Sequence, residues 1–320
     1  MKNCPYCNEA LKDTANFCHN CGEKYKAPAA SIVLVEKNAK KPTKKEIQEL
    51  EDIFCVKELP DGTYSISDGV GSFEDYEVPS FVSEIGSGAF SEIEDLNEIT
   101  IGENVKYIDI DAFENSNLDI LNITLSQEAM ESISSQTTNA GLDEVFPYVT
   151  EFNVTISDSA TVITERLFAT LGGITEIDIP DSVEVIEMGA FGDCCDLENV
   201  YFGNSVRVIG ANAFESCAFL QDVTFPDSLE IIEENAFASC CDFTELNFPD
   251  NLKKIGDNAF YDCSSVESVY FGKSVETVSG DAFDGCYDIT YVSLRDDTPL
   301  KIRDLVCMFP DDCEIERLDN

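Results

Sequence analysis

The 320-residue sequence contains no tryptophan and a single histidine, His19. Histidine is the side chain that most often serves as a general acid or base, and none follows His19 in the chain. The G-x-S-x-G pattern of a nucleophilic serine and the G-x-x-x-x-G-K loop of phosphate-binding proteins are also missing. We therefore expect no enzymatic activity, because the sequence offers neither a positioned base nor an open metal site.

Long apolar runs are missing as well. No stretch approaches the roughly 18 apolar residues of a membrane-spanning helix. Met1 is followed almost at once by a cysteine motif, without the apolar segment of a signal peptide. We expect a cytoplasmic protein with no membrane span, and a cell-surface location stays open as the alternative.

Positive charge is scarce. The chain has 20 Lys and Arg against 63 Asp and Glu, a formal net charge of −43. Residues 1–46 hold nine of the basic residues and five of the acids, so the rest of the chain is even more acidic. Such a body repels nucleic-acid phosphates and anionic membranes. The sequence therefore favours a neutral or basic protein partner, and we expect no nucleic-acid partner.

Cysteine, in contrast, is plentiful near the start of the chain. Two C-x-x-C pairs are separated by ten residues, and they comprise Cys4, Cys7, Cys18 and Cys21. Four thiolates in two such pairs suit tetrahedral Zn²⁺, and they leave no open position for catalysis. The segment resembles the short zinc ribbons found at the N-termini of many bacterial proteins. We predict a structural zinc ribbon over residues 1–25, and its metal pattern favours a reducing compartment.

A tether and a cap are expected next. Residues 26–42, with several Lys, Ala and two Pro, are typical of a flexible linker. Thr43 and Glu46 then fit a helix-capping box, and Ile47, Leu50 and Phe54 would share one helical face. We predict an N-terminal cap over residues 43–75. The alternative is a free amphipathic helix that serves another partner.

The main body is a 23-residue repeat. Its landmark phenylalanines recur at a constant interval from Phe168 to Phe283, and Phe90 and Phe113 are also 23 apart. A fixed period of this size predicts a solenoid, whose units bury their apolar faces by stacking on one another. Phe146 is a candidate landmark for a loose unit. We predict eight clear rungs and one loose rung. The solenoid should span residues 76–294, with an irregular rung at 119–160, and a C-terminal cap should follow at 295–320.

Each unit follows the pattern L-x-x-V-x-F-P-x-S-V-x-x-I-G-x-x-A-F-x-x-C and resembles the BspA-like leucine-rich repeat. The resemblance covers about 220 residues. It implies a mostly β solenoid of right-handed stacked rungs with short helices. Many members of that family act as adhesins at bacterial cell surfaces, although this chain shows no signal peptide or anchor.

Five units also carry a closing cysteine three residues after the landmark Phe, namely Cys194, Cys217, Cys240, Cys263 and Cys286. Stacking would place these residues in one column, where neighbours could approach disulfide distance. We interpret the column as buried thiols that act as small apolar side chains. The extra neighbours Cys195 and Cys241 are the ones we expect to be reactive, whereas Cys307 and Cys313 should be buried.

The outward positions of the repeat strands are the candidate partner-binding surface. In leucine-rich repeat proteins such a sheet face contacts the partner, and tyrosine suits protein contacts among acids. The alternative is that these residues only serve as strand formers with polar ends. The candidates are Asn199, Tyr201, Asp222, Thr224, Glu245, Asn247, Ser268, Tyr270, Tyr291 and Ser293.

The sequence thus predicts a non-catalytic protein-interaction scaffold that carries a structural zinc ribbon. A cell-surface or secreted adhesin-like protein is the first alternative. A regulator that uses the ribbon for contact with a nucleic acid or a protein is the second.

Overall fold

The computed structural model describes residues 2–3, 10–11, 41–221 and 223–318, which form two units, Met1–Lys41 and Pro42–Asn320. In the first unit, β1 (Lys2–Asn3) pairs antiparallel with β2 (Ala10–Leu11). The predicted zinc ligands Cys4, Cys7, Cys18 and Cys21 lie outside the described residues, as does most of the predicted linker. The repeats belong to the second unit.

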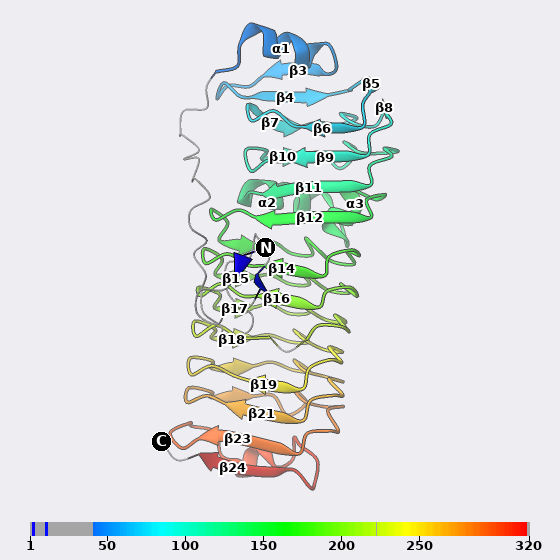
Figure 1. Cartoon of the computed structure of the whole chain (residues 1–320). Helices are drawn as coiled ribbons and strands as arrows, with labels where there is room; N and C mark the ends of the chain where they lie inside the picture. Colours follow the sequence, from blue (N-terminus) through cyan, green and yellow to red (C-terminus); the bar gives the residue numbers. More distant parts are fainter. Residues whose placement is uncertain (1, 4–9, 12–40, 222, 319–320) are drawn as a thin grey trace. The chain divides into compact units, whose positions relative to one another are not determined.

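The second unit is a stack of parallel rungs, drawn in Figure 1 as strands one above another. About eleven turns are present, two more than the nine expected, because strands at both ends extend the stack. Most turns contribute one strand to a first sheet, which is divided into three separately hydrogen-bonded groups. Its strands are β6 (Asp75–Glu77), β9 (Glu98–Ile101), β11 (Ile120–Leu125), β12 (Glu151–Ile156), β14 (Glu176–Asp178), β16 (Asn199–Tyr201), β19 (Glu245–Asn247), β21 (Ser268–Phe271), β23 (Tyr291–Arg295) and β24 (Glu314–Leu318).

A second sheet closes the other side of the rungs. It begins with the antiparallel pair β3 (Cys55–Glu58) and β4 (Tyr64–Ser67) and continues with parallel strands. These are β7 (Val82–Ile85), β10 (Tyr107–Ile108), β13 (Val162–Ile163), β15 (Val185–Ile186), β17 (Val208–Ile209), β18 (Ile231–Ile232), β20 (Lys254–Ile255) and β22 (Thr277–Val278). A small side pair joins β5 (Gly71–Ser72) to β8 (Ile93–Glu94).

Four short helices complete the described part of the chain: α1 (Lys44–Glu51), α2 (Gln127–Gln136), α3 (Gly141–Val145) and α4 (Ile302–Leu305). None of them has the length and apolar character that a membrane crossing would need. The mostly β solenoid with short helices that the sequence predicts is therefore confirmed.

The landmark phenylalanines form a column through the core. From Phe168 to Phe283, neighbouring ring centroids lie 4.8–5.5 Å apart and the ring planes are within 7° of parallel. Phe90 stacks on Phe113 in the same way, and Phe146 contacts Phe113 at 4.7 Å, as expected for the loose landmark. The ring spacing is close to the 4.7–4.9 Å between paired strands, so each ring follows the repeat of its own rung.

Both ends of this column are covered. Thr43 and Glu46 form the predicted capping box of α1, and the ring of Phe54, just after the helix, packs edge-on against Phe90 at 5.3 Å. At the other end, Phe309 covers Phe283 at 5.2 Å. Arg317 occupies an inward position of the last strand, where the paired position of β23 holds Leu294. Its guanidinium donates to four backbone carbonyls between Arg295 and Leu300, so a polar clamp ends the apolar column.

The turn before the landmark Phe has a left-handed residue in most rungs. Two residues before the landmark Phe, φ is positive at Gly88, Gly189, Asn212, Asn235 and Asn258, residue types that tolerate this conformation. Arg166 occupies the equivalent place with φ at 52°. For most L-residues the left-handed region costs about 1–2 kcal/mol, whereas asparagine visits it routinely. Arg166 is therefore a locally unfavourable residue in an otherwise consistent column.

We predict that Arg166→Asn raises the free energy of unfolding by about 0.5–1 kcal/mol, because it relieves this backbone strain. The ion pair lost with Glu165 is exposed and contributes little. The matched change Asn258→Ala should lower the free energy by about 1 kcal/mol. Urea denaturation of the three proteins checks both signs, and a destabilised Arg166→Asn variant would contradict the argument.

Candidate functional site

The outward side chains of the first sheet form the surface that the sequence singled out, which we call the sheet face. Inward neighbours such as Val200, Val269 and Val292 are buried, so the alternate positions point away from the core. Strand pairing brings Glu245, Ser268 and Tyr291 into one column and Asn247, Tyr270 and Ser293 into another. Asn199 and Tyr201 lie on β16 at the equivalent repeat positions.

The candidates on the sheet face differ in their exposure. Thr224, Glu245 and Asn247 are exposed, and five residues are half-buried, namely Asn199, Tyr201, Ser268, Tyr270 and Tyr291. Asp222 lies outside the described residues. The central part of the face therefore offers polar side chains to a partner.

Ser293 does not belong with the accessible candidates, and its assignment is wrong on this point. Only 5% of its surface is exposed. Its small side chain lies in the column between Tyr270 and Glu316, whose longer side chains come from the two neighbouring strands. Strand alternation predicted its direction, but not the size of its neighbours.

Two tyrosines on the sheet face, Tyr201 and Tyr291, have neighbouring acids and a raised pKa. Burial, together with the negative charges of Glu176 and Asp178, raises the pKa of Tyr201 to about 12. Tyr291 donates a hydrogen bond from its hydroxyl to Glu316, and this bond raises the Tyr291 pKa. Both phenols therefore stay protonated at neutral pH and can present a hydroxyl group and an aromatic ring edge to a partner.

Acids extend the sheet face beyond the residues expected. Glu314 and Glu316 of β24 pair with Tyr291 and Ser293, and at the other end Asp75 pairs with Glu98. The alternation of Glu314, Ile315 and Glu316 is a partial signal for this last strand, and Arg317 interrupts it. Across the two columns the described strands place nine carboxylates and neither Lys nor Arg: Asp75, Glu77, Glu98, Glu151, Glu176, Asp178, Glu245, Glu314 and Glu316.

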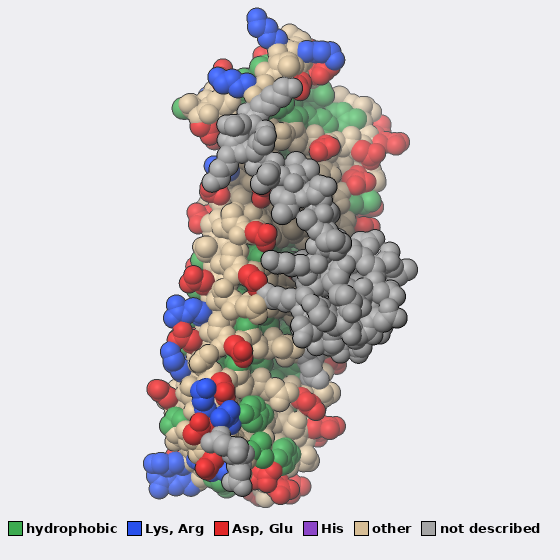
Figure 2. Space-filling model, turned by 60° about the vertical axis from the view of Figure 1, so that its left-hand side comes forward, with side chains coloured by type: hydrophobic (Ala, Val, Ile, Leu, Met, Phe, Trp, Pro, Cys, Tyr) green, Lys and Arg blue, Asp and Glu red, His purple; other side chains and the backbone are tan. Residues whose placement is uncertain are grey.

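Basic side chains are placed elsewhere. On the face that Figure 2 shows, acidic side chains occur along the whole stack and basic ones at a few places. Two basic residues, Arg207 and Lys253, line a shallow hollow of about 460 Å³. Its other lining residues are Glu184, Asn204, Ser205, Ser228, Glu230 and Asn251. Successive rungs place Glu184, Arg207, Glu230 and Lys253 in one column, so the charges alternate along it.

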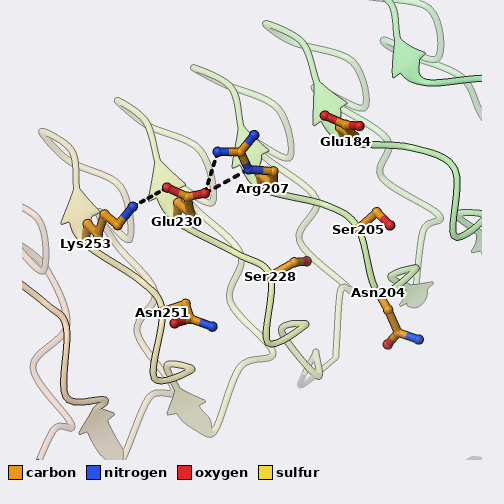
Figure 3. Close-up of a pocket in the computed structure, with 8 residues that line it drawn as sticks. All are labelled: Glu184, Asn204, Ser205, Arg207, Ser228, Glu230, Asn251 and Lys253. Atoms are coloured by element: carbon orange, nitrogen blue, oxygen red, sulfur yellow. Dashed lines mark hydrogen bonds and ion pairs between the residues drawn. The ribbon is translucent and has the colours of Figure 1, made fainter.

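Glu230 is the centre of this column, and Figure 3 shows Arg207 and Lys253 reaching toward it from the rungs on either side. Arg207 donates through Nε at 2.8 Å and through Nη2 at 2.6 Å, and Lys253 completes the group. Hydrogen bonds from Lys253 and Arg207 lower the pKa of Glu230. The hollow is lined by two acids, Glu184 and Glu230, and by two bases, Arg207 and Lys253, so it has no excess charge with which to hold an ion.

The cysteine column is buried, as expected. Each of its five thiols donates to the backbone carbonyl of the landmark Phe one rung earlier, at 2.9–3.1 Å. Burial raises the pKa of Cys217 to about 12 and raises that of Cys194 well above its usual range. The five thiols are therefore buried, hydrogen-bonded core groups, and the ten cysteines from Cys55 onward that the structure describes are all free.

The cysteines outside this column differ in their exposure. Cys195 is exposed and Cys241 partly exposed, and the reactivity expected of both stays a prediction. Cys307 is also exposed and Cys313 only partly buried, so the expectation that both are buried is wrong. Within the described residues, no group of three or more histidine, cysteine or acidic side chains is arranged to hold a metal ion.

The stacked parallel rungs, the phenylalanine column and the polar sheet face define a leucine-rich repeat solenoid. Residues 65–194, 143–240 and 184–304 match the BspA type leucine rich repeat region, in 6 copies. The chain therefore belongs to the BspA-type leucine-rich repeat family. A comparison with curated proteins gives no match.

Several solved structures are similar to the chain. A leucine rich cell surface protein from Faecalibacterium prausnitzii is 20% identical, with 82% of this chain and 93% of that chain covered and a TM-score of 0.36. A leucine-rich repeat protein of T. pallidum is 18% identical, covering 82% and 98%, with a TM-score of 0.39. The pneumococcal vaccine antigen PcpA is 16% identical, covering 82% and 91%, with a TM-score of 0.36.

The Glu230 ion pairs give a pH dependence. A carboxylate whose pKa is lowered by folding stabilises the protein above its unfolded pKa of about 4.3, and this contribution is lost as the pH falls through the folded value. We predict that Glu230→Gln lowers the urea midpoint at pH 7 and that its difference from the wild type vanishes at acidic pH.

The control is Glu276→Gln in the same column, since Glu276 makes no ion pair with a described residue. Denaturation curves between pH 7 and pH 2 make the comparison. An effect of Glu230→Gln that persists unchanged at pH 2 would rule out the ion pairs as its source.

Proposed function

We propose that the protein is a non-catalytic scaffold that binds a protein partner through the sheet face. The observation that carries this proposal is the composition of the two outward columns, which combine nine carboxylates with Tyr201, Tyr270 and Tyr291 and contain no basic residue. Membership in the leucine-rich repeat family supports it, because such proteins typically bind proteins.

The charge of the face favours a basic partner. Like charges directly opposite each other on neighbouring strands are destabilising, and Asp75 and Glu98 are paired in this way. Lysine and arginine side chains of a partner would relieve the repulsion and would also accelerate association. The column at Glu230 balances its charges with ion pairs between rungs, whereas the two columns of the sheet face contain no basic residue to balance theirs.

The tyrosines define the region where we expect the strongest contacts. Tyr270 and Tyr291 lie on paired strands, β21 and β23, and Tyr201 lies on β16 nearer the middle of the stack. Tyrosine supplies a large contact area with few rotatable bonds, and it is enriched where single residues dominate binding energy. The surrounding residues Thr224, Asn247 and Ser268 would form a polar margin.

We predict that the triple change Tyr201→Ala, Tyr270→Ala and Tyr291→Ala abolishes binding of the partner, because tyrosine is enriched among the few interface residues whose truncation costs about 2 kcal/mol or more. The measurement is quantitative mass spectrometry of proteins captured from a bacterial lysate by the full chain at low and at physiological salt. Binding of a basic partner should weaken as salt increases.

The matched control replaces three tyrosines that lie away from the sheet face, Tyr148, Tyr261 and Tyr287, which are 47–81% exposed. This control should capture the same proteins as the wild type. If the control loses the partner and the sheet-face variant keeps it, the contact lies on the turns of the rungs and the proposal fails.

We propose in addition that Cys4, Cys7, Cys18 and Cys21 hold one structural Zn²⁺. The support is the donor set, because four thiolates in two C-x-x-C pairs match the ligands of closed zinc sites. The cytoplasmic location is part of the same proposal, and it is supported by the ten free thiols of the described residues, which suit a reducing compartment.

The full chain should bind about one zinc ion per molecule, as measured by elemental mass spectrometry after dialysis. Replacing the four cysteines with serine should remove the metal, because serine is a poor zinc ligand. The solenoid should keep its thermal unfolding midpoint, since it forms a separate unit. The control Cys195→Ser should keep the metal. Zinc retained by the fourfold variant would contradict the assignment.

A further inference from the structure

The ladders that run through the solenoid are interrupted in the same region. The second sheet ends at β10 and begins again at β13. The first sheet is broken between β12 and β14, which are not paired, and it is broken again between β16 and β19. Ring contacts in the phenylalanine column link Phe90, Phe113 and Phe146, and a second run begins at Phe168. In the second sheet and in the phenylalanine column, residues 126–159 therefore separate two regular stacks.

Helix α2 occupies the level at which a strand of the second sheet is missing, and it contacts both β10 and β13. Figure 1 shows α2 and α3 beside the rungs of β11 and β12, between the two regular parts of the stack. Its N-cap Ser126 accepts from the Ala129 amide and donates to the Val105 carbonyl. Gly141 follows, with a φ of 36° and a position where a Cβ would lie 2.1 Å from the Leu167 carbonyl oxygen. The insertion is thus fitted closely against both neighbours.

Gln127 takes over the acceptor role of a missing strand. In a regular rung, the amides of Arg207 and Val208 donate to the backbone carbonyl of Glu184, one rung earlier. The equivalent amides at the start of the second stack are those of Thr161 and Val162. Both donate, at 3.0 Å, to the side-chain oxygen Oε1 of Gln127.

Gln136 takes over the donor role on the other side. In a regular rung, the Gly210 amide donates to the Ile186 carbonyl. The equivalent carbonyl at the end of the first stack is that of Ile108, and it accepts from Nε2 of Gln136 at 2.8 Å. The Oε1 atom of the same side chain accepts from the Ile110 amide at 3.2 Å. The side-chain amide groups of Gln127 and Gln136 therefore replace backbone peptide groups, one on each side of the helix.

We propose that the α2 rung is a built-in boundary that divides the solenoid into two cooperative units, residues 42–125 and 160–318, and that Gln127 and Gln136 couple them. The stability of a repeat protein is approximately a sum of repeat and nearest-neighbour terms, so cooperativity is lost where an interface is weakest. Here the continuous backbone ladder of the second sheet gives way to bonds from side chains that retain rotational freedom.

The first test locates the boundary in the full chain by hydrogen exchange across a urea series. Ile85→Val and Ile209→Val remove one methyl group at buried positions of the same column, in β7 and β17. Each should lower the midpoint only of peptides from its own unit, by about 0.5 M urea. The shorter N-terminal stack should unfold first. A single midpoint for both units, moved equally by either change, would overturn the proposal.

The second test addresses the coupling residues by exchange at single amides without denaturant. Gln127→Leu should speed exchange at Thr161 and Val162 about tenfold, and Gln136→Leu should do so at Ile110. The amides of Arg207 and Val208 are internal controls, since they occupy the same place in a regular rung. Unchanged exchange at Thr161, Val162 and Ile110 would remove the glutamines from the coupling.

Discussion

One geometric constraint governs this solenoid: each rung repeats the one before it at the distance between paired strands, about 4.8 Å. A residue is therefore packed on its own counterpart 23 positions away. For apolar residues this is favourable, and the stacked rings from Phe168 to Phe283 follow from it. Isolated aromatic pairs prefer offset or edge-on contacts. The near-parallel ring planes of the landmark phenylalanines are thus set by the repeat. Phe54, which lies outside the repeat at the start of the column, makes an edge-on contact with Phe90.

The same constraint makes charge costly. An acid repeated at every rung would be stacked on other acids, and the column through Glu230 avoids this by alternating Glu184, Arg207, Glu230 and Lys253. The two columns of the sheet face do not alternate, and their acids are diluted only by neutral residues such as Thr224 and Asn247, because Arg295 lies beyond them at the end of β23. A chain that can balance a column, and leaves this one unbalanced, keeps a surface that is complementary to positive charge.

The sequence predicts the parts of the fold that repeat. The interval between landmark phenylalanines defines the stack, and the capping box at Thr43 identifies the helix that starts it. The departures are local. Ser293 has the outward position that alternation predicts, but its burial depends on the size of Tyr270 and Glu316 in neighbouring strands. The strand β24 is not predicted from the sequence, because one of its inward positions holds Arg317, which interrupts the apolar pattern.

The α2 rung is the least predictable part, because its contacts have no period. Nothing in the sequence around Gln127 or Gln136 indicates that these two side chains substitute for strand backbone. Their role becomes visible only in the structure, from the backbone groups that they contact. A parallel ladder can tolerate a helix only if its exposed amides and carbonyls find other partners, as buried backbone groups must. Primary amides suit this task, because one group carries both a donor and an acceptor of the peptide type. The insertion therefore leaves the hydrogen-bond pattern of the second sheet satisfied, while the acidic strands β6 to β11 and the tyrosine-bearing strands β16 to β23 lie on opposite sides of it.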